Sequence, residues 1–305
     1  MKTGFLYAGQ GSQHPGMGAD MYETYPAFRA VFDSVEAGFD LKKVCFADPE
    51  HVLDRTRYTQ PCMVAFAAGM TAVLGQKGIV PDMVAGLSLG EYSALHAAGV
   101  FSAKTAVSLA AFRGHAMEEA ARGIESAMTA VIGLKREDLE AVCREASIWG
   151  VVAVTNENCP GQTVIGGQKE AVLHAARLAK ERGAKRCVPL KVSGPFHTSL
   201  MAPAGEALRH RFAEIGFADP SVPVIFNCLG DVMGREDSIP ALLVRQVQSG
   251  VRMEECIRKM VSMGAERIIE IGPGRVLSGF VRRIAPDILL DGAETAEDVE
   301  ALAGA

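Results

Sequence analysis

Short runs of apolar residues alternate with longer amphipathic stretches along the whole chain. The short runs predict β-strands, and the stretches between them, with apolar positions three and four residues apart, predict helices. This alternation is typical of an α/β protein with a largely parallel sheet. The expected strands are Thr3–Tyr7, Met83–Gly86, Met128–Leu134, Val151–Thr155, Thr163–Ile165, Cys187–Val192, Val222–Asn227 and Arg267–Ile271.

The middle of the chain has a different order of elements. Between residues 126 and 192 the pattern gives strand, helix (Arg136–Ser147), strand, strand, helix (Gln168–Arg182), strand. This βαββαβ order is that of a ferredoxin-like unit. We therefore expect a large α/β domain formed by residues 1–125 and 193–305, with residues 126–192 inserted as a small ferredoxin-like domain.

Composition and charge exclude several classes of protein. The 305 residues include 31 Lys and Arg and 36 Asp and Glu, so the net charge is −5, which argues against a nucleic-acid partner. No uninterrupted apolar stretch reaches the roughly 18 residues of a membrane span. The seven cysteines are scattered and form no CxxC pair, which argues against a zinc ribbon or a disulfide framework. A cytoplasmic protein that binds no membrane is expected.

Two glycine-rich segments do not complete a nucleotide-binding motif. Gly9-Gln-Gly11 and Gly272-Pro-Gly274 both lack the third glycine of a dinucleotide fingerprint, because His14 and Leu277 occupy those positions. The sequence contains no P-loop motif and no HExxH motif. We therefore expect neither a bound nucleotide cofactor nor a metal.

A G-x-S-x-G motif at Gly86–Gly90 predicts a serine nucleophile. Ser88 follows a short apolar strand and precedes a helix predicted at Glu91–Ala98, which is the context of a nucleophile elbow. The glycines permit the tight turn, and the backbone N–H of Leu89 would be placed to stabilise an oxyanion. The alternative is a glycine-rich turn with an ordinary serine.

His197 is the best candidate for the general base. It lies in Ser193–Thr198, just after a predicted strand end, and it follows the nucleophile in chain order as in hydrolase-type folds. The alternative is a loop histidine that caps a helix or packs, and His14 also remains possible. No carboxylate is evident to orient His197, so a dyad oriented by a backbone carbonyl is expected.

Two polar residues fall on apolar helix faces. Arg113 lies within the apolar stripe of a helix predicted at Lys104–Ala121. A buried guanidinium needs an anion, which is either an internal carboxylate or the carboxylate of a substrate. Gln246 shares the inward face of the helix Ile239–Val247, so its amide or its backbone points inward; a buried glutamine satisfied by the main chain is the commoner outcome.

Taken together, these motifs resemble the malonyl-CoA:acyl carrier protein transacylases, which are related to the acyltransferase domains of polyketide and fatty-acid synthases. The resemblance covers essentially the whole chain and implies a hydrolase-like large domain with a ferredoxin-like insert. Its markers are Gly9–Gln13, Gly86–Leu95, Phe112–Gly114, Asn156–Gln162, Gly194–His197, Val244–Gln246 and Glu270–Gly274.

The resemblance assigns catalytic roles to matching residues. It implies that Ser88 is acylated and that His197 is its general base. It also implies that the backbone carbonyl of Gln246 orients the histidine, and that the backbone N–H groups of Gln10 and Leu89 form the oxyanion hole.

The resemblance also implies how the acyl group is bound. Arg113 would hold the free carboxylate of the malonyl group, and Phe196 fits the malonyl-type pattern, where methylmalonyl-specific members usually carry serine. The expected acyl pocket is Leu87, Met117, Asn156, Asn158 and Phe196. The chain departs from the family pattern at Leu87, where the family usually has histidine, and at Ala8, where the family usually has proline.

The implied activity is an S-malonyl transfer from coenzyme A to acyl carrier protein, which supplies extender units for fatty-acid synthesis. Malonyl-CoA and the carrier protein would be its partners, with the coenzyme A thioester as substrate and no permanently bound cofactor. Carrier proteins are acidic, so Lys185 and Arg186 are candidates for a basic docking patch, and the alternative is a solvated surface pair. The alternatives are a discrete acyltransferase of a polyketide synthase, a serine thioesterase and a catalytically silent binding protein. A monomer is expected.

Overall fold

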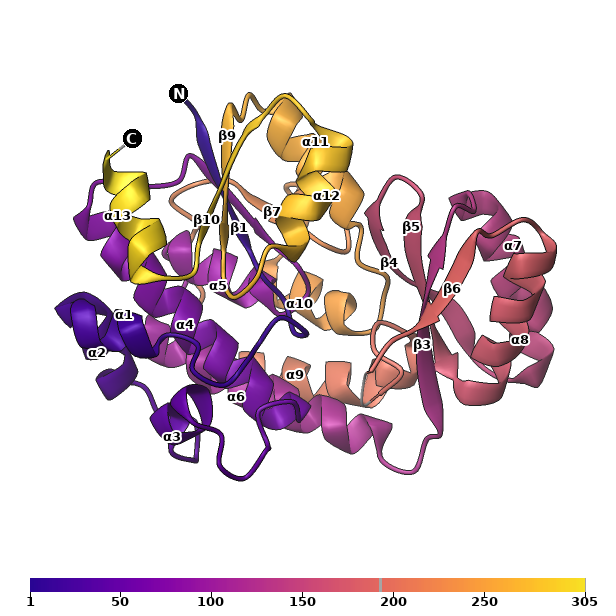
Figure 1. The fold of residues 1–305 in the computed structure, drawn as a ribbon. Coiled ribbons are helices and arrows are strands. Elements are labelled where there is room, and N and C mark those ends of the chain that lie inside the picture. The colour runs from indigo at the N-terminus through magenta and orange to yellow at the C-terminus, as the bar shows by residue number, and fades with distance from the viewer. Residues whose placement is uncertain (192–193, 305) are drawn as a thin grey trace.

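The computed structural model describes residues 1–191 and 194–304 and is an α/β protein with two separate sheets (Figure 1). The larger sheet has six strands in the order β10-β9-β1-β2-β7-β8, and all its pairs are parallel except β7 with β8. Its strands are β1 (Thr3–Tyr7), β2 (Met83–Gly86), β7 (Val224–Phe226), β8 (Asp231–Val232), β9 (Arg267–Ile271) and β10 (Leu289–Ala293).

Helices cover both faces of the larger sheet, because alternate strand residues point into two different apolar cores. Phe5 and Tyr7 of β1 pack with α4, α5 and α6 on one face. Leu6, between them, packs with α11 and α12 on the other face. Every residue of β1 is buried, as expected for a parallel strand covered on both sides. These helices are α4 (Thr56–Gln76), α5 (Gly90–Ala97), α6 (Ala103–Ala121), α11 (Met253–Ser262) and α12 (Val276–Ile284).

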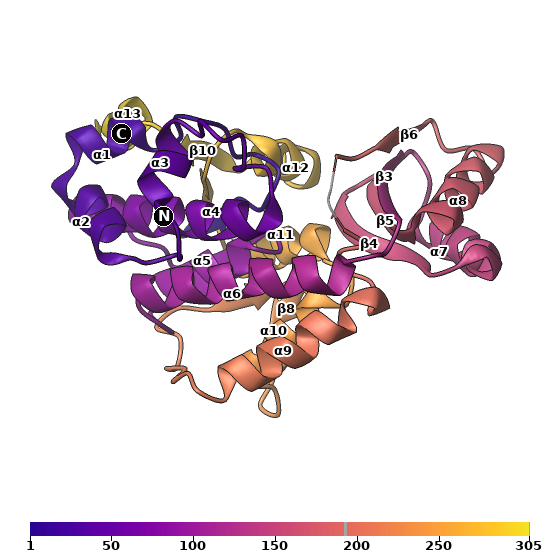
Figure 2. The same ribbon diagram turned by 90° about the horizontal axis from the view of Figure 1, so that it is seen from below.

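The remaining helices complete the outer layers of the larger sheet. Figure 2 shows α6 and α9 side by side along one face. Val299 and Leu302 of the last helix, α13, pack into the same apolar core as α4. The helices of this group are α1 (Ala19–Thr24), α2 (Pro26–Ser34), α3 (Leu41–Phe46), α9 (Ala202–Phe212), α10 (Ile239–Val247) and α13 (Ala296–Gly304).

The smaller sheet is antiparallel and lies to one side of the larger one (Figures 1 and 2). Its strand order is β4-β5-β3-β6, and α7 and α8 cover one of its faces. Its opposite face contributes Met128, Ala130 and Val164 to the main apolar core. The elements are β3 (Ser126–Ile132), α7 (Arg136–Ala146), β4 (Val152–Cys159), β5 (Gln162–Gln168), α8 (Lys169–Glu181) and β6 (Arg186–Pro189), in the chain order that the sequence predicts.

Backbone hydrogen bonds join the smaller sheet to the chain that follows α10. The N–H of Val251 donates to the carbonyl of Thr155 at 2.8 Å, and the N–H of Glu157 donates to the carbonyl of Val251 at 2.8 Å. Strand β4, which carries Asn156 and Asn158, is therefore fixed against the segment that begins with the end of α10. The link holds one wall of the space between the two sheets.

Most expected elements are present with ends that agree or are shifted by one or two residues. The larger differences are that β4 continues to Cys159 rather than Thr155, β5 continues to Gln168 rather than Ile165, and β6 ends at Pro189. Two strands of the structure were not expected from the sequence. β8 has only two residues, and in β10, at a sheet edge, Asp291 and Gly292 interrupt the apolar pattern. The expected strand Cys187–Val192 corresponds to β6, and its last residue, Val192, lies outside the described residues, as does Ser193. The expected boundary between residues 192 and 193 therefore falls there too. In the part of the chain that the structure describes, no helix is long and apolar enough to cross a membrane.

Candidate active site

Ser88 lies in a tight turn between β2 and α5. Its φ angle is +52°, in the left-handed region that residues other than glycine rarely adopt. A Cβ on Gly86 would lie 2.1 Å from the backbone of Gly90, and one on Gly90 would lie 2.3 Å from the carbonyl oxygen of Tyr7. Both glycines are therefore required by close backbone packing, and the turn has the strand–turn–helix form of a nucleophile elbow.

His197 contacts the serine through one ring nitrogen and the main chain through the other. Its Nε2 lies 2.7 Å from Ser88 Oγ, and its Nδ1 lies 3.0 Å from the carbonyl oxygen of Gln246. Since a carbonyl can only accept, Nδ1 carries the hydrogen and Nε2 is free to accept the serine proton. Burial and the nearby Arg113 guanidinium lower the pKa of His197 to about 4, so the imidazole is neutral at neutral pH.

The fully buried Arg113 reaches Ser88 from α6. Its Nη2 donates to Ser88 Oγ at 3.2 Å and to Gln246 Oε1 at 3.0 Å, and its guanidinium lies 5.5 Å from the ring centre of Tyr92. It forms no direct ion pair with a carboxylate of the described residues, although Glu91 interacts with it electrostatically, and its Nε has no hydrogen-bond partner among them. The internal-carboxylate interpretation of Arg113 therefore finds no support in these contacts.

The buried acid nearest to this cluster is Glu91 in the first turn of α5. Burial raises the pKa of Glu91 to about 8, despite the opposing effects of the Asn227 backbone N–H and of Arg113. Burial therefore favours the protonated form of this carboxyl group, which weakens the negative charge that Glu91 presents to Arg113. The site thus presents a buried cation that can accept an anionic group of a ligand.

A cavity of about 810 Å³ lies between the two sheets and contains these groups. Ser88, His197 and Arg113 line it together with Gln10 and Leu89, the two residues expected to form an oxyanion hole. Gln10 follows β1, and its side chain donates to Thr56 Oγ1 at 3.0 Å, whereas Leu89 is the residue before α5. Gln246 contacts His197 and Arg113 and is not among the described residues that line the cavity.

All five residues of the expected acyl pocket line the same cavity. Asn156 and Asn158 come from β4 of the smaller sheet. The others are Leu87 in the elbow, Met117 in α6 and Phe196 in the segment before His197. Asn158 is buried, and its Oδ1 has no partner within the described chain. Apolar and amide groups therefore surround the reacting atoms.

Sequence reasoning missed several polar residues of this region. Gln60 of α4 is buried in the cavity wall, with its Nε2 3.4 Å from Met117 Sδ and its Oε1 unpartnered among the described residues. Gln162 and Lys191 also line the cavity. A glutamine at position 60 within a strongly apolar helical stretch was the available signal, and it matches the pattern that singled out Arg113.

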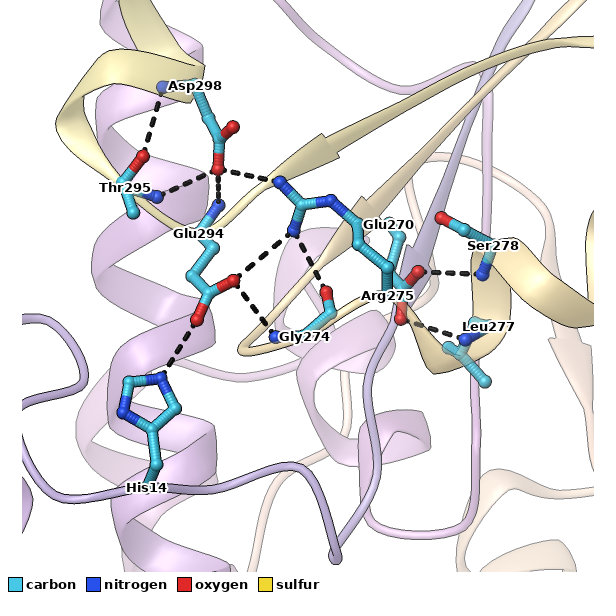
Figure 3. Close-up of polar contacts among 9 residues, drawn as sticks. All are labelled: His14, Glu270, Gly274, Arg275, Leu277, Ser278, Glu294, Thr295 and Asp298. Carbon is cyan, nitrogen blue, oxygen red and sulfur yellow. Dashed lines mark hydrogen bonds and ion pairs between the residues drawn. The ribbon is translucent and has the colours of Figure 1, made fainter.

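His14 belongs to a polar network at the rim of the site (Figure 3). Its Nε2 lies 2.9 Å from Glu294 Oε1, and Glu294 Oε2 also accepts from the N–H of Gly274 at 3.0 Å. Arg275 joins Glu294 to Asp298, with a 2.8 Å contact from its Nη2 to Asp298 Oδ2. The histidine that bonds to Ser88 is His197, whereas His14 ties the loop after β1 to the segment after β10.

Glu270 fixes the start of α12 beside this rim. Its two carboxylate oxygens accept from the backbone N–H groups of Leu277 at 2.9 Å and Ser278 at 2.7 Å, as Figure 3 shows. These are N–H groups of the first helical turn, which have no acceptor within the helix. Because Leu277 and Phe280 line the cavity, Glu270 positions one side of its opening.

The two basic residues suggested for docking lie at the start of β6. Lys185 and Arg186 are both exposed, and neither lines the cavity. Lys191, farther along the same segment, is exposed and does line it. The cavity therefore has an exposed basic side chain, Lys191, in its lining.

Comparison with known proteins matches residues 4–298 to the acyl transferase domain family. A malonyl CoA-acyl carrier protein transacylase of Bacillus subtilis is 43% identical over 286 residues, which is 93% of this chain and 90% of the relative. The crystal structure of MCAT from Streptococcus pneumoniae is 46% identical, with a TM-score of 0.94 over 99% of both chains. The PlMCAT:AntF complex, a type II PKS acyl-carrier protein with its malonyl-transacylase, matches with a TM-score of 0.95 at 36% identity, over 100% of this chain and 99% of that one. This chain belongs to the acyl transferase family and, within it, to the malonyl CoA-acyl carrier protein transacylases.

Proposed function

We propose that this protein transfers a malonyl group from coenzyme A to the phosphopantetheine thiol of acyl carrier protein through a malonyl ester of Ser88. The observation that carries this proposal is the buried Arg113 guanidinium, which has no carboxylate partner among the described residues and lies 3.2 Å from Ser88 Oγ. A cation at this place can bind a carboxylate on the acyl group being transferred. The names of the relatives support malonyl as that group.

The first half-reaction acylates the serine. His197 Nε2 takes the hydroxyl proton as Ser88 Oγ attacks the thioester carbonyl. The backbone N–H groups of Gln10 and Leu89 stabilise the oxyanion of the tetrahedral intermediate. When the C–S bond breaks, the imidazolium returns the proton to the departing coenzyme A sulfur, and the malonyl ester of Ser88 remains.

The second half-reaction transfers the acyl group to the carrier protein. His197 takes the proton of the phosphopantetheine thiol, and the resulting thiolate attacks the ester carbonyl. Collapse of the intermediate breaks the bond to Ser88 Oγ, which recovers its proton from His197. Arg113 holds the malonyl carboxylate throughout and keeps the ester carbonyl at the oxyanion hole, where transfer competes with hydrolysis.

The acyl pocket sets which groups are accepted. Phe196, 7% exposed, closes the space beside His197 and favours the unbranched malonyl group over methylmalonyl. Met117 supplies an apolar wall, and Asn156 and Asn158 supply amides from β4. Leu87 presents an apolar side chain where the family usually has histidine, so it is a further determinant of acyl choice. The reaction uses the coenzyme A thioester as substrate, and its steps are assigned to side chains and backbone groups alone.

The domain organisation is part of the same proposal. The larger sheet with its helices forms a hydrolase-like domain from residues 1–125 and 193–305, and residues 126–192 form a ferredoxin-like insert. The strand order β4-β5-β3-β6 and the helices on one face support the second assignment. We also assign the protein to the cytoplasm, where its seven free cysteines would stay reduced.

Two alternatives concern the acceptor. The second candidate is transfer to a carrier protein of polyketide synthesis, and the reaction would be the same. The match to a transacylase in complex with a type II PKS carrier favours it. A thioesterase, with water as acceptor, is disfavoured because an esterase has no need of the buried Arg113 beside its nucleophile.

A transfer assay with several acyl donors tests the proposal. The protein is mixed with malonyl-, methylmalonyl- or acetyl-CoA and with holo carrier proteins of fatty-acid and polyketide synthesis, and acyl-carrier formation and hydrolysis are measured in parallel. We expect malonyl transfer to the fatty-acid carrier to be fastest and to exceed hydrolysis. Hydrolysis without transfer would identify a thioesterase, and transfer only to the polyketide carrier would identify the second candidate.

A further inference from the structure

The strained conformation of Ser88 is held by side chains from outside the elbow. The carbonyl oxygen of Ser88 accepts from Gln246 Nε2 at 2.7 Å, and the N–H of Ser88 donates to Asn227 Oδ1 at 2.6 Å. A non-glycine residue at a φ of +52° persists only when its surroundings fix it. Gln246 already has a role in orienting His197, but Asn227 has none in the mechanism.

Asn227 continues the parallel ladder of the sheet beyond its last strand pair. Strands β2 and β7 pair in register up to Ala85 and Ile225, and Asn227 is the first residue after β7. Its Nδ2 donates to the carbonyl of Gly86 at 2.7 Å, while its Oδ1 accepts from the N–H of Ser88. These are the peptide groups on the two sides of Leu87. One side-chain amide therefore supplies the donor and the acceptor that the backbone of a continuing strand would supply.

Asn227 is itself fixed by its neighbours. Its N–H donates to Glu91 Oε2 at 2.6 Å, and its carbonyl accepts from the N–H of Arg252 at 2.9 Å. Asn227 and Glu91 are both fully buried. Water therefore cannot replace these hydrogen bonds when one partner is removed, and the loss is transmitted to the elbow.

We propose that Asn227, held in place by Glu91, is a positioning residue that keeps the Ser88 backbone in the left-handed conformation in which Oγ faces His197. Asn227 touches no reacting atom, and its effect is on where Oγ lies. A displacement of about 1 Å of a nucleophile can cost on the order of a hundredfold in rate. The inference rests on the proposed function only in taking Ser88 as the nucleophile.

A fluorophosphonate probe tests the position of Ser88 without relying on malonyl transfer. Its reaction forms a bond from Ser88 Oγ to phosphorus and expels fluoride, while His197 takes the hydroxyl proton. We expect Asn227→Ala to lower the labelling rate of folded protein by about tenfold to a hundredfold. Acylation by malonyl-CoA and by acetyl-CoA should fall by that same factor, with the KM for malonyl-CoA unchanged.

A matched control separates positioning from general loss of stability. Thr71→Val removes the hydrogen bond of 2.8 Å between Thr71 Oγ1 of α4 and the Tyr7 hydroxyl of β1, and neither residue lines the cavity. It should lower the melting temperature and leave labelling of folded protein unchanged. Labelling of folded Asn227→Ala at the rate of the unmodified protein would overturn the proposal.

Asn227→Asp provides a second test that does not depend on the alanine variant folding. A protonated carboxyl group can donate to the Gly86 carbonyl and accept from the Ser88 N–H, whereas an ionised one can only accept. The labelling rate relative to unmodified protein at the same pH should therefore rise as pH falls from about 8.5 to about 6. Taking this ratio corrects for the pH dependence of the unmodified protein, to which Glu91, Cys228, Cys256 and His197 contribute beside the fixed charge of Arg113. A ratio that falls as the pH is lowered would contradict the proposal, because the protonated carboxyl group is the form that can make both hydrogen bonds.

The two proposals fail in different ways. If the unmodified protein is labelled at Ser88 but transfers no malonyl group, the proposed function is wrong and the role of Asn227 is still decided by labelling. If malonyl transfer occurs and Asn227→Ala is labelled normally, the proposed function stands and the role of Asn227 is wrong.

Discussion

The Nη2 atom of Arg113 lies 3.2 Å from Ser88 Oγ, and Arg113 is the only buried arginine among the described residues. On the proposed function, this guanidinium lies beside the site of acylation. Replacement of Arg113 by alanine should remove the contact with a malonyl carboxylate. A hydrogen-bonded charge pair contributes about 1.5–3 kcal/mol, which corresponds to roughly 10- to 150-fold in kcat/KM for malonyl-CoA. Acetyl transfer, which lacks the carboxylate, should fall much less.

The control for this change lies on the end of the same helix. Arg122 has a side chain that is 76% exposed, and among the described residues it pairs only with the neighbouring Glu119. Arg122→Ala should leave both transfer rates unchanged. Equal losses of malonyl and acetyl transfer in Arg113→Ala would mean that the guanidinium does not bind the acyl carboxylate.

The pH dependence of acylation should report the buried state of His197. Because burial and Arg113 lower its pKa to about 4, the base stays neutral, and the acylation rate should stay level on the acid side until the pH approaches that value. The same pKa shift affects folding stability. As the pH falls below 6.5, His197 takes up a proton in the unfolded state but stays neutral in the folded state until the pH approaches about 4. The free energy of unfolding therefore falls as pH drops through this window.

Single-turnover acylation rates measured across pH check this expectation. Arg113→Ala removes one of the causes of the low pKa, so the acid limb should move upward in that variant. A limb near the ordinary histidine value in the unmodified protein would show that His197 is not the buried neutral base described here.

Phe196 should limit the size of the acyl group. Phe196→Ser opens space beside His197, so methylmalonyl transfer should rise relative to malonyl transfer in a competition assay. The loss of a buried aromatic side chain should also cost about 3 kcal/mol of folding stability. Phe196→Leu, which keeps most of the volume, serves as the control, and an unchanged acyl ratio in the serine variant would exclude Phe196 as the size determinant.

The contact between His14 and Glu294 should make stability depend on pH. The hydrogen bond to Glu294 raises the pKa of His14 above 6.5 in the folded state. Its stabilisation is therefore fully present below pH 6.5 and is lost as pH rises through the folded-state pKa. The melting-temperature difference between unmodified protein and His14→Gln should be larger in acid than in alkali.

A double-mutant cycle isolates this pair from the rest of the rim network. Glu294→Gln alone should remove the pH-dependent part, and adding His14→Gln should then have little further effect. A pH dependence that survives in Glu294→Gln would place its origin at another group.

The sequence allowed the elbow, the base and the buried arginine to be predicted because each leaves a local mark. Glycines flank Ser88 in sequence, His197 follows a strand end, and Arg113 interrupts an apolar stripe. The edge strand β10 was missed because Asp291 and Gly292 break the apolar run.

Contacts that depend on distant segments left no such mark. Asn227 lies 139 residues from Ser88 along the chain and meets it only because β7 pairs with β2. The tertiary arrangement, which no local pattern encodes, decides such contacts.

The central claim is that Ser88 carries the malonyl group between the two half-reactions. Intact-protein mass spectrometry after mixing with malonyl-CoA, followed by peptide mapping, tests it most directly. We predict a malonyl adduct on the Ser88 peptide that disappears when holo carrier protein is added, with malonyl-carrier appearing in equal amount, and no adduct in Ser88→Ala. An unmodified Ser88 during active transfer, or an adduct that the carrier cannot remove, would contradict the account.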